Sequence, residues 1–217
     1  RASRLGSIRD KDGTLIVEAQ GAERSTDHTL ILGTRIDFTD DYNDPRRGVR
    51  MDLSRHHTPP TDSGPDFSVY DLNLTGYVPI GSRSTWVFNH LRSDAVVSRQ
   101  GETDPAAIQQ QNGINCANPS LTALQQQYCN EVVNGMVANN TYGSATSLGG
   151  LSRLRSYGQA RFRGAHTQFY GTELRWNLTD ESTPFDIFVM KDVRTAFQLA
   201  FFYEVGSTAD LLQDVGK

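Results

Sequence analysis

The feature that most constrains this fold is a two-residue alternation of apolar and polar side chains that recurs in six segments. The segments are residues 29–39, 49–56, 69–78, 84–97, 168–178 and 197–206. Successive side chains of a strand point to opposite faces, so this period predicts six half-buried β-strands. Connections rich in Pro, Gly, Asp and Asn, such as 43–48 and 58–66, predict hairpins and therefore an antiparallel meander.

The polar faces of these strands carry full charges in mid-strand. The charged residues are Arg35, Asp37, Asp52, Asp71, Glu173 and Arg175. In a soluble β-sandwich such a face meets water, whereas in a membrane barrel it lines the interior while the apolar face meets lipid. Alternation alone fits both folds. The aromatic residues of 168–178 and 197–206 favour the barrel, because Trp and Tyr gather at bilayer interfaces.

Charge and hydropathy narrow the functional classes. A membrane-spanning helix needs about 18 consecutive apolar residues. No stretch of the sequence reaches this length, so we expect no membrane-spanning helix. The net charge is −4 and the arginines are scattered among acids, which argues against nucleic-acid binding. A mean hydropathy of −0.49 suits a soluble β protein and equally a membrane barrel, whose strands alternate.

A long connection between two predicted strands, residues 99–149, predicts a surface loop, because connections of this length are usually functional or disordered. Within it, residues 118–137 have the composition of a short helix. Ser120 is expected to cap its start and Gly135 to lie near its end.

The two cysteines of the chain, Cys116 and Cys129, both lie in this connection. Their short separation and polar surroundings predict a disulfide, and with it an oxidising compartment. Two free thiols are the alternative.

One segment begins as an arginine-rich loop and ends as a strand. It includes LRSYGQARFRG at 154–164 and TELRWNL at 172–178. This resembles the signature of the BamA/TamA/FhaC superfamily of bacterial outer-membrane assembly and secretion barrels, in which a [V/L/I]-R-G-[F/Y] loop motif precedes a Glu-x-Arg strand. DFTDDYNDPRRGVRMDLS at 37–54 and AFFYEVG at 200–206 resemble two further family segments, in the family's order. The resemblance spans Leu30 to Gly206, the later half of a family barrel.

The resemblance implies an all-β fold: an antiparallel up-and-down transmembrane β-barrel, of which residues 1–217 supply the later strands and 99–149 a long extracellular loop with a short helix. It also implies that the loop 150–165 folds into the lumen, where Arg155 is held by Glu173 and by Glu204, which stands where the family has Asp. A guanidinium suits this role because its planar fork matches carboxylates.

The remaining motif residues are Leu154, Ser156 and Tyr157. Ser156 replaces the family's Gly, so strain is expected there if the backbone needs a positive φ. Tyr157 is expected to pack while its hydroxyl reaches a partner. Supporting charges in the lumen are expected from Arg175, Arg161 and Arg163.

In function, the resemblance implies a barrel of the bacterial outer membrane that helps to insert or secrete other proteins without covalent chemistry. Its expected partners are outer-membrane lipids, client β-barrel or secreted proteins and accessory assembly proteins. No nucleic acid, cofactor, metal or enzymatic activity is expected. Two alternatives remain open: a passive pore or anchor barrel for a fused passenger domain, and a soluble secreted β-sandwich that binds other molecules.

Residues that could suggest other chemistry have simpler interpretations. His56 and His57 are adjacent on a strand and so point to opposite faces, which makes a poor metal pair. The acids of the 37–44 segment lack the spacing of a calcium loop and are predicted to be turn residues. Glu173 and Glu204 could form a carboxylate pair for glycoside cleavage, but neighbouring arginines favour ion pairing.

Overall fold

The structure is a computed structural model that describes residues 29–61, 64–178, 188 and 197–216. Six short strands beyond these ranges are described by their backbone alone and pair as β1–β4, β2–β3 and β10–β11. Their bounds are Ala2–Ser3 (β1), Ile8–Arg9 (β2), Leu15–Val17 (β3), Ser25–Thr26 (β4), Phe185–Ile187 (β10) and Met190–Val193 (β11).

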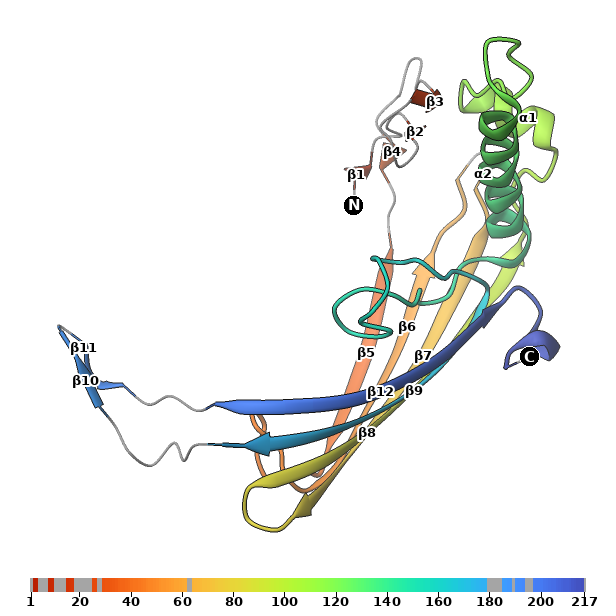
Figure 1. The fold of residues 1–217 in the computed structure, drawn as a ribbon. Helices are drawn as coiled ribbons and strands as arrows, with labels where there is room; N and C mark the ends of the chain where they lie inside the picture. Colours follow the sequence, from red (N-terminus) through yellow and green to blue (C-terminus); the bar gives the residue numbers. More distant parts are fainter. Residues whose placement is uncertain are drawn as a thin grey trace.

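The main element is one six-stranded antiparallel sheet with the order β12-β9-β8-β7-β6-β5. Its strands are β5 (Leu30–Asp37), β6 (Gly48–Thr58), β7 (Asp66–Ile80), β8 (Ser84–Arg99), β9 (His166–Asn177) and β12 (Gln198–Ala209). All six predicted strands and the meander are confirmed. The sheet is strongly curved (Figure 1), but it is not closed into a barrel, since β5 and β12 form its two edges.

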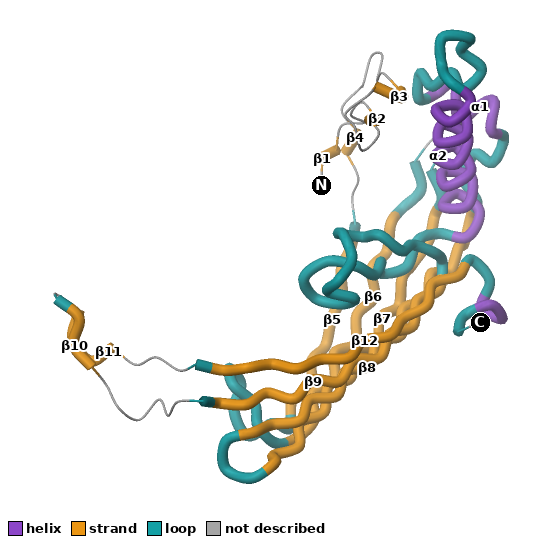
Figure 2. The backbone as a smooth tube through the Cα atoms, viewed as in Figure 1, coloured by secondary structure: helices purple, strands orange, loops and turns teal. Residues whose placement is uncertain are grey.

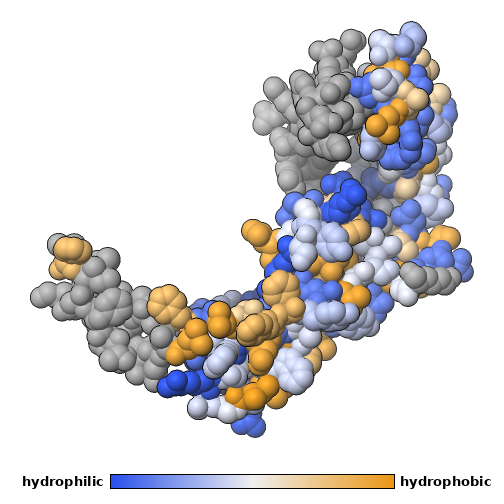
Figure 3. All heavy atoms as spheres, in the orientation of Figure 1, coloured by the Kyte–Doolittle hydropathy of each residue, from blue (hydrophilic) through white to orange (hydrophobic). Residues whose placement is uncertain are grey.

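The two faces of the sheet differ in chemistry. The loop face is the side of the sheet on which the loop of residues 143–165 lies. This face carries charged side chains, including Arg35, Asp71 and Glu173. The other side, the open face, carries a band of apolar side chains that are partly or largely exposed. These include Leu32, Leu53, Tyr70, Leu74, Val78, Trp86, Phe88, Tyr170, Leu174, Trp176, Leu199, Phe201, Tyr203 and Val205. Figure 3 shows hydrophobic residues gathered on the part of the sheet away from α2.

The connection between β8 and β9 contains two helices, α1 (Pro105–Gln111) and α2 (Ala123–Tyr142), where the sequence predicted one. Figures 1 and 2 show α2 continuing beyond the ends of β7 and β8. The predicted cap was wrong: Thr122 caps α2 through a reciprocal capping box: its hydroxyl accepts the Gln125 backbone N–H, and the Gln125 side-chain oxygen accepts the Thr122 backbone N–H. Gly135 lies inside α2, and Gly143, with φ 78°, ends it.

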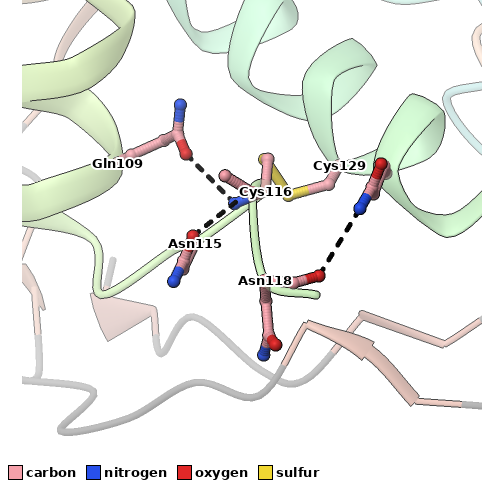
Figure 4. Close-up of a disulfide and its surroundings, with 7 residues drawn as sticks. Gln109, Asn115, Cys116, Asn118 and Cys129 are labelled. Carbon is pink, nitrogen blue, oxygen red and sulfur yellow. Dashed lines mark hydrogen bonds between the residues drawn. A yellow bond between two sulfur atoms is a disulfide. The ribbon is translucent and has the colours of Figure 1, made fainter. Parts of the chain in front are cut away.

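The predicted disulfide is confirmed. Cys116, in the α1–α2 connection, is bonded to Cys129 in α2. The bridge packs with Ile108, Ile114 and Val133 in a small hydrophobic core. Figure 4 shows the Gln109 side chain accepting a hydrogen bond from the Cys116 backbone N–H, at 3.1 Å. The bridge thus ties the α1–α2 connection to α2 within this small core.

Among the described residues, no helix is both long enough and apolar enough to cross a membrane.

Candidate functional site: the loop on the charged face

The chain returns from α2 to β9 through a loop, residues 143–165, whose two limbs pair with each other. Leu148 and Phe162 exchange backbone hydrogen bonds of 3.0 Å in both directions, and the Ala145 N–H donates to the Gly164 carbonyl at 2.9 Å. The loop therefore has its own backbone structure before it contacts the sheet.

Apolar contacts hold this loop on the sheet. Leu148 and Leu154 are buried against Leu91 of β8 and Phe169 of β9. Gly206 of β12 is needed at this contact, because a Cβ there would lie 2.5 Å from the Leu148 Cδ1 atom. A small residue in the edge strand thus makes room for the loop.

Arg155 is the most highly connected residue of the loop. Its Nη1 atom lies 2.8 Å from Glu173 Oε2 on β9, and its Nε atom lies 2.7 Å from Glu204 Oε1 on β12. Its backbone N–H donates to the second oxygen of Glu204 at 2.8 Å. The guanidinium also lies over the Phe202 ring, 3.7 Å from its centroid. The pairing of Arg155 with Glu173 and Glu204 is the one that the family resemblance implies.

The two carboxylates are well shielded. The Glu204 side chain is 7% exposed and that of Glu173 is 15% exposed. Glu173 is shared, since Arg175 Nε donates to its other oxygen at 2.7 Å. Burial lowers the pKa of Arg155, but hydrogen bonds and charge from Glu173 and Glu204 outweigh it and raise that pKa overall. Arg155 therefore stays charged, and both carboxylates are engaged in ion pairs.

A second anchor, absent from the sequence prediction, fixes the start of the loop. The Thr146 hydroxyl donates to Asp71 Oδ1 of β7 at 3.0 Å, and its backbone N–H donates to the Ser93 hydroxyl of β8 at 2.9 Å. Arg153 also interacts electrostatically with Asp71, while burial lowers the Arg153 pKa. The Arg153 Nε atom is buried and has no hydrogen-bond partner among the described residues. Only the polar loop-face position of Asp71 hinted at this anchor in the sequence.

The three arginines expected as supporting charges differ in their contacts. Arg175 joins the ion-pair network, as expected. Arg161 and Arg163 are both exposed, and neither forms an ion pair within the described part of the chain, so their role as supporting lumen charges stays a prediction. Arg163 donates instead to the Ala160 carbonyl, at 3.3 Å. Both arginines lie on the limb of the loop that returns to β9, whereas Arg155 lies nearer the tip of the loop.

The expectations for the motif's Ser and Tyr also need correction. Positive φ values occur at Leu154 (50°) and Ala160 (51°), not at Ser156, so the missing glycine causes no such strain. Tyr157 is 53% exposed and packs edge-to-face on Phe162, with ring centroids 5.0 Å apart. No hydroxyl partner of Tyr157 is found in the described residues.

The acidic turn and the histidine pair serve local structure. The Asp40 carboxylate accepts the backbone N–H groups of Arg46 and Arg47, each at 2.9 Å, which lowers the Asp40 pKa. His56 lies on the loop face, 3.4 Å from Asp71, whereas His57 lies on the open face. The predicted opposite orientation of the two histidines is confirmed.

Comparisons with known proteins add no relative. A scan against family models found no match, and neither did searches of curated proteins and of solved structures. The functional argument therefore depends on the geometry of the loop and on the two faces of the sheet.

Proposed function

We propose that this chain forms the later strands of an outer-membrane β-barrel of the assembly and translocation type, which helps to insert or secrete other proteins without covalent chemistry. One observation carries the proposal: the chain's own loop lies on the charged face of the sheet, over β7, β8, β9 and β12, while the apolar face is left uncovered by any described element. A water-soluble sheet protein buries its apolar face instead.

The exposed open face favours a lipid environment. Trp176, Phe201 and Tyr203 are 46%, 60% and 69% exposed. Each large apolar side chain gains roughly 1.5–3 kcal/mol when it leaves water completely. A face carrying many such side chains is therefore strongly driven to find an apolar environment. A soluble β-sandwich would supply it with a second layer, and the described residues contain none.

Strand length and aromatic placement are consistent with this environment. β8 has 16 residues, and β9 and β12 have 12 each. A tilted transmembrane strand needs only about 9–11 residues. Trp86 and Trp176 lie on the open face near the short Gly81–Arg83 turn, where an aromatic girdle of a barrel is expected.

The assembly role is supported by where Arg155 is held. Its two carboxylate partners come from β9 and from the edge strand β12, so the loop links the edge of the sheet to the neighbouring strand. An edge strand can template a client strand through its free backbone groups. A loop that braces this edge could hold the barrel in one state, which is the role implied by the family resemblance.

The membrane part of the proposal is tested by purifying the protein in detergent and comparing unboiled and boiled samples on a denaturing gel. A closed, detergent-resistant barrel gives a faster-moving unboiled band. A single band from a protein that remains soluble without detergent would refute the proposal in favour of the soluble sandwich.

The assembly part needs a test in cells. Depletion of the protein is expected to lower the abundance of other outer-membrane barrels or of secreted proteins. Reintroduced wild-type protein and the Arg161→Ala variant should restore this abundance, and the Arg155→Ala variant should restore it less well. Unchanged abundance after depletion would indicate a passive pore or anchor instead.

A further inference from the structure

The open face is not apolar along its whole length. Strand register places Leu32, Arg55, Tyr70, Asp94 and His166 side by side in one row across β5, β6, β7, β8 and β9. Towards the Gly81–Arg83 turn the exposed positions are mainly apolar, while charged side chains begin at Arg92, one row nearer that turn, and continue in this row. The row therefore marks a boundary between an apolar and a polar zone.

A groove crosses this boundary. It has a volume of about 370 Å³, and its lining includes the apolar Leu32, Leu53 and Leu72, Tyr70, two cations, Arg55 and Arg92, and the Asp94 carboxylate. Further along β7 lies a second, almost entirely apolar hollow of about 470 Å³. Gly76 is part of its lining, and a side chain there would meet no atom within 4 Å. The open face thus has cations in the lining of one groove and, closer to the Gly81–Arg83 turn, an apolar hollow.

Arg55 and Arg92 differ in how far nearby carboxylates neutralise their charge. Arg92 forms a two-point ion pair with Asp94, with N–O distances of 2.8 and 2.6 Å, and His166 Nδ1 also lies 2.7 Å from Asp94. Arg55 contacts no carboxylate in the described residues. Its guanidinium reaches only the Ser68 hydroxyl, at 3.2 and 3.4 Å, and lies 5.6 Å from the centre of the Tyr70 ring.

We infer that this groove binds an anionic phospholipid, with the lipid phosphate between Arg55 and Arg92 and an acyl chain along the apolar part of the face. The inference rests on the proposed function, because it requires the open face to meet lipid. Charge complementarity supports it: an exposed guanidinium that has no carboxylate partner among the described residues, placed at the edge of an apolar zone, matches a phosphate joined to a hydrocarbon chain.

The test is a competition between dioleoyl phosphatidylglycerol and dioleoyl phosphatidylcholine for the protein in detergent, read by native mass spectrometry. The wild type is expected to prefer the anionic lipid. Arg55→Gln should lower this preference about fivefold, the contribution of one arginine near an anionic headgroup. Arg55→Gln with Arg92→Gln should lower it further. Excess inorganic phosphate should not displace the lipid, because it lacks the acyl chain.

Arg47→Gln is the matched control, since Arg47 is exposed and lies at the opposite ends of the strands. If Arg47→Gln lowered the preference for the anionic lipid as much as Arg55→Gln, or if Arg55→Gln left it unchanged, the proposed phospholipid site would be refuted. Displacement by inorganic phosphate would overturn its lipid character. Each variant must first keep the heat-modifiable band of the wild type.

A separate readout distinguishes failure of the site from failure of the proposed function. Trp86 and Trp176 lie on the open face, so lipids with brominated chains should quench their fluorescence equally in wild type and Arg55→Gln. Absent quenching would refute contact between this face and lipid. Quenching together with an unaltered headgroup preference would refute only the phospholipid site.

Discussion

Replacing Arg155 with alanine tests whether the charged loop contact holds the loop in place. The substitution removes the side-chain bonds to Glu204 at 2.7 Å and to Glu173 at 2.8 Å. It leaves the backbone bond from residue 155 to Glu204 and the Arg175–Glu173 pair intact. Apolar anchors, including Leu148, also remain.

The expected cost follows from these contacts. A hydrogen bond to a charged group contributes roughly 1.5–3 kcal/mol, so two of them sum to about 3–6 kcal/mol. The lower end applies here, because Glu173 keeps Arg175 and Glu204 keeps a backbone donor. A loss of about 3 kcal/mol shifts the ratio of docked to undocked loop by roughly a hundredfold.

Hydrogen–deuterium exchange of the folded protein in detergent measures this ratio. The N–H groups of residue 155 and Thr146 are bonded across the contact, to the Glu204 carboxylate and the Ser93 hydroxyl of the sheet, and report docking of the loop. In Arg155→Ala their exchange should accelerate by up to about a hundredfold when it occurs through undocking. Amides of β8 should be unaffected.

Arg161→Ala is the control, because it removes the same charge from the same loop and Arg161 forms no ion pair within the described residues. Its exchange should match that of the wild type. Equal protection in Arg155→Ala and wild type, or equal acceleration in both variants, would refute the reasoning that the carboxylate contacts hold the loop.

Three further predictions concern other parts of the chain. Reduction of Cys116–Cys129 removes about 3 kcal/mol of constraint, so exchange should accelerate in α1 and α2 while the sheet stays protected. Gly206→Val should undock the loop with Arg155 intact, because its Cβ would lie 2.5 Å from Leu148; unchanged loop exchange would contradict this. Backbone N–H groups lower the Asp40 pKa, so the turn gains stability above the ordinary value of 3.8 and loses it as the pH falls through the lowered pKa. Asp40→Asn should remove that dependence, as followed by exchange of the turn amides by NMR.

Much of the fold could be predicted from local pattern. Alternation assigned the six strands, and it also assigned which side chains share a face, as with Arg35 and Asp37 against Leu32. The reason is that the pleat of a strand imposes its period on every residue. The disulfide was predictable because both cysteines lie close together in one connection.

Helix ends and loop contacts were less predictable. Ser120 and Thr122 are both acceptable caps, and the choice depends on the Gln125 side chain reaching back to the Thr122 backbone. The short helix α1 was missed because one buried residue, Ile108, supplies its apolar contact and leaves no periodic signal. Arg153 and Arg155 have similar sequence surroundings, yet of these two only Arg155 forms ion pairs among the described residues.

By itself, the sequence determined the strands, the order of their hairpins and the opposite character of the two faces, since these depend on neighbours along the chain. Tertiary structure alone decided which face is covered. Docking of the loop requires Leu148 to fit over Gly206, and Glu173 and Glu204 to approach from separate strands. The Arg155–Glu204 contact alone joins residues 49 positions apart, and no local pattern records how distant segments pack.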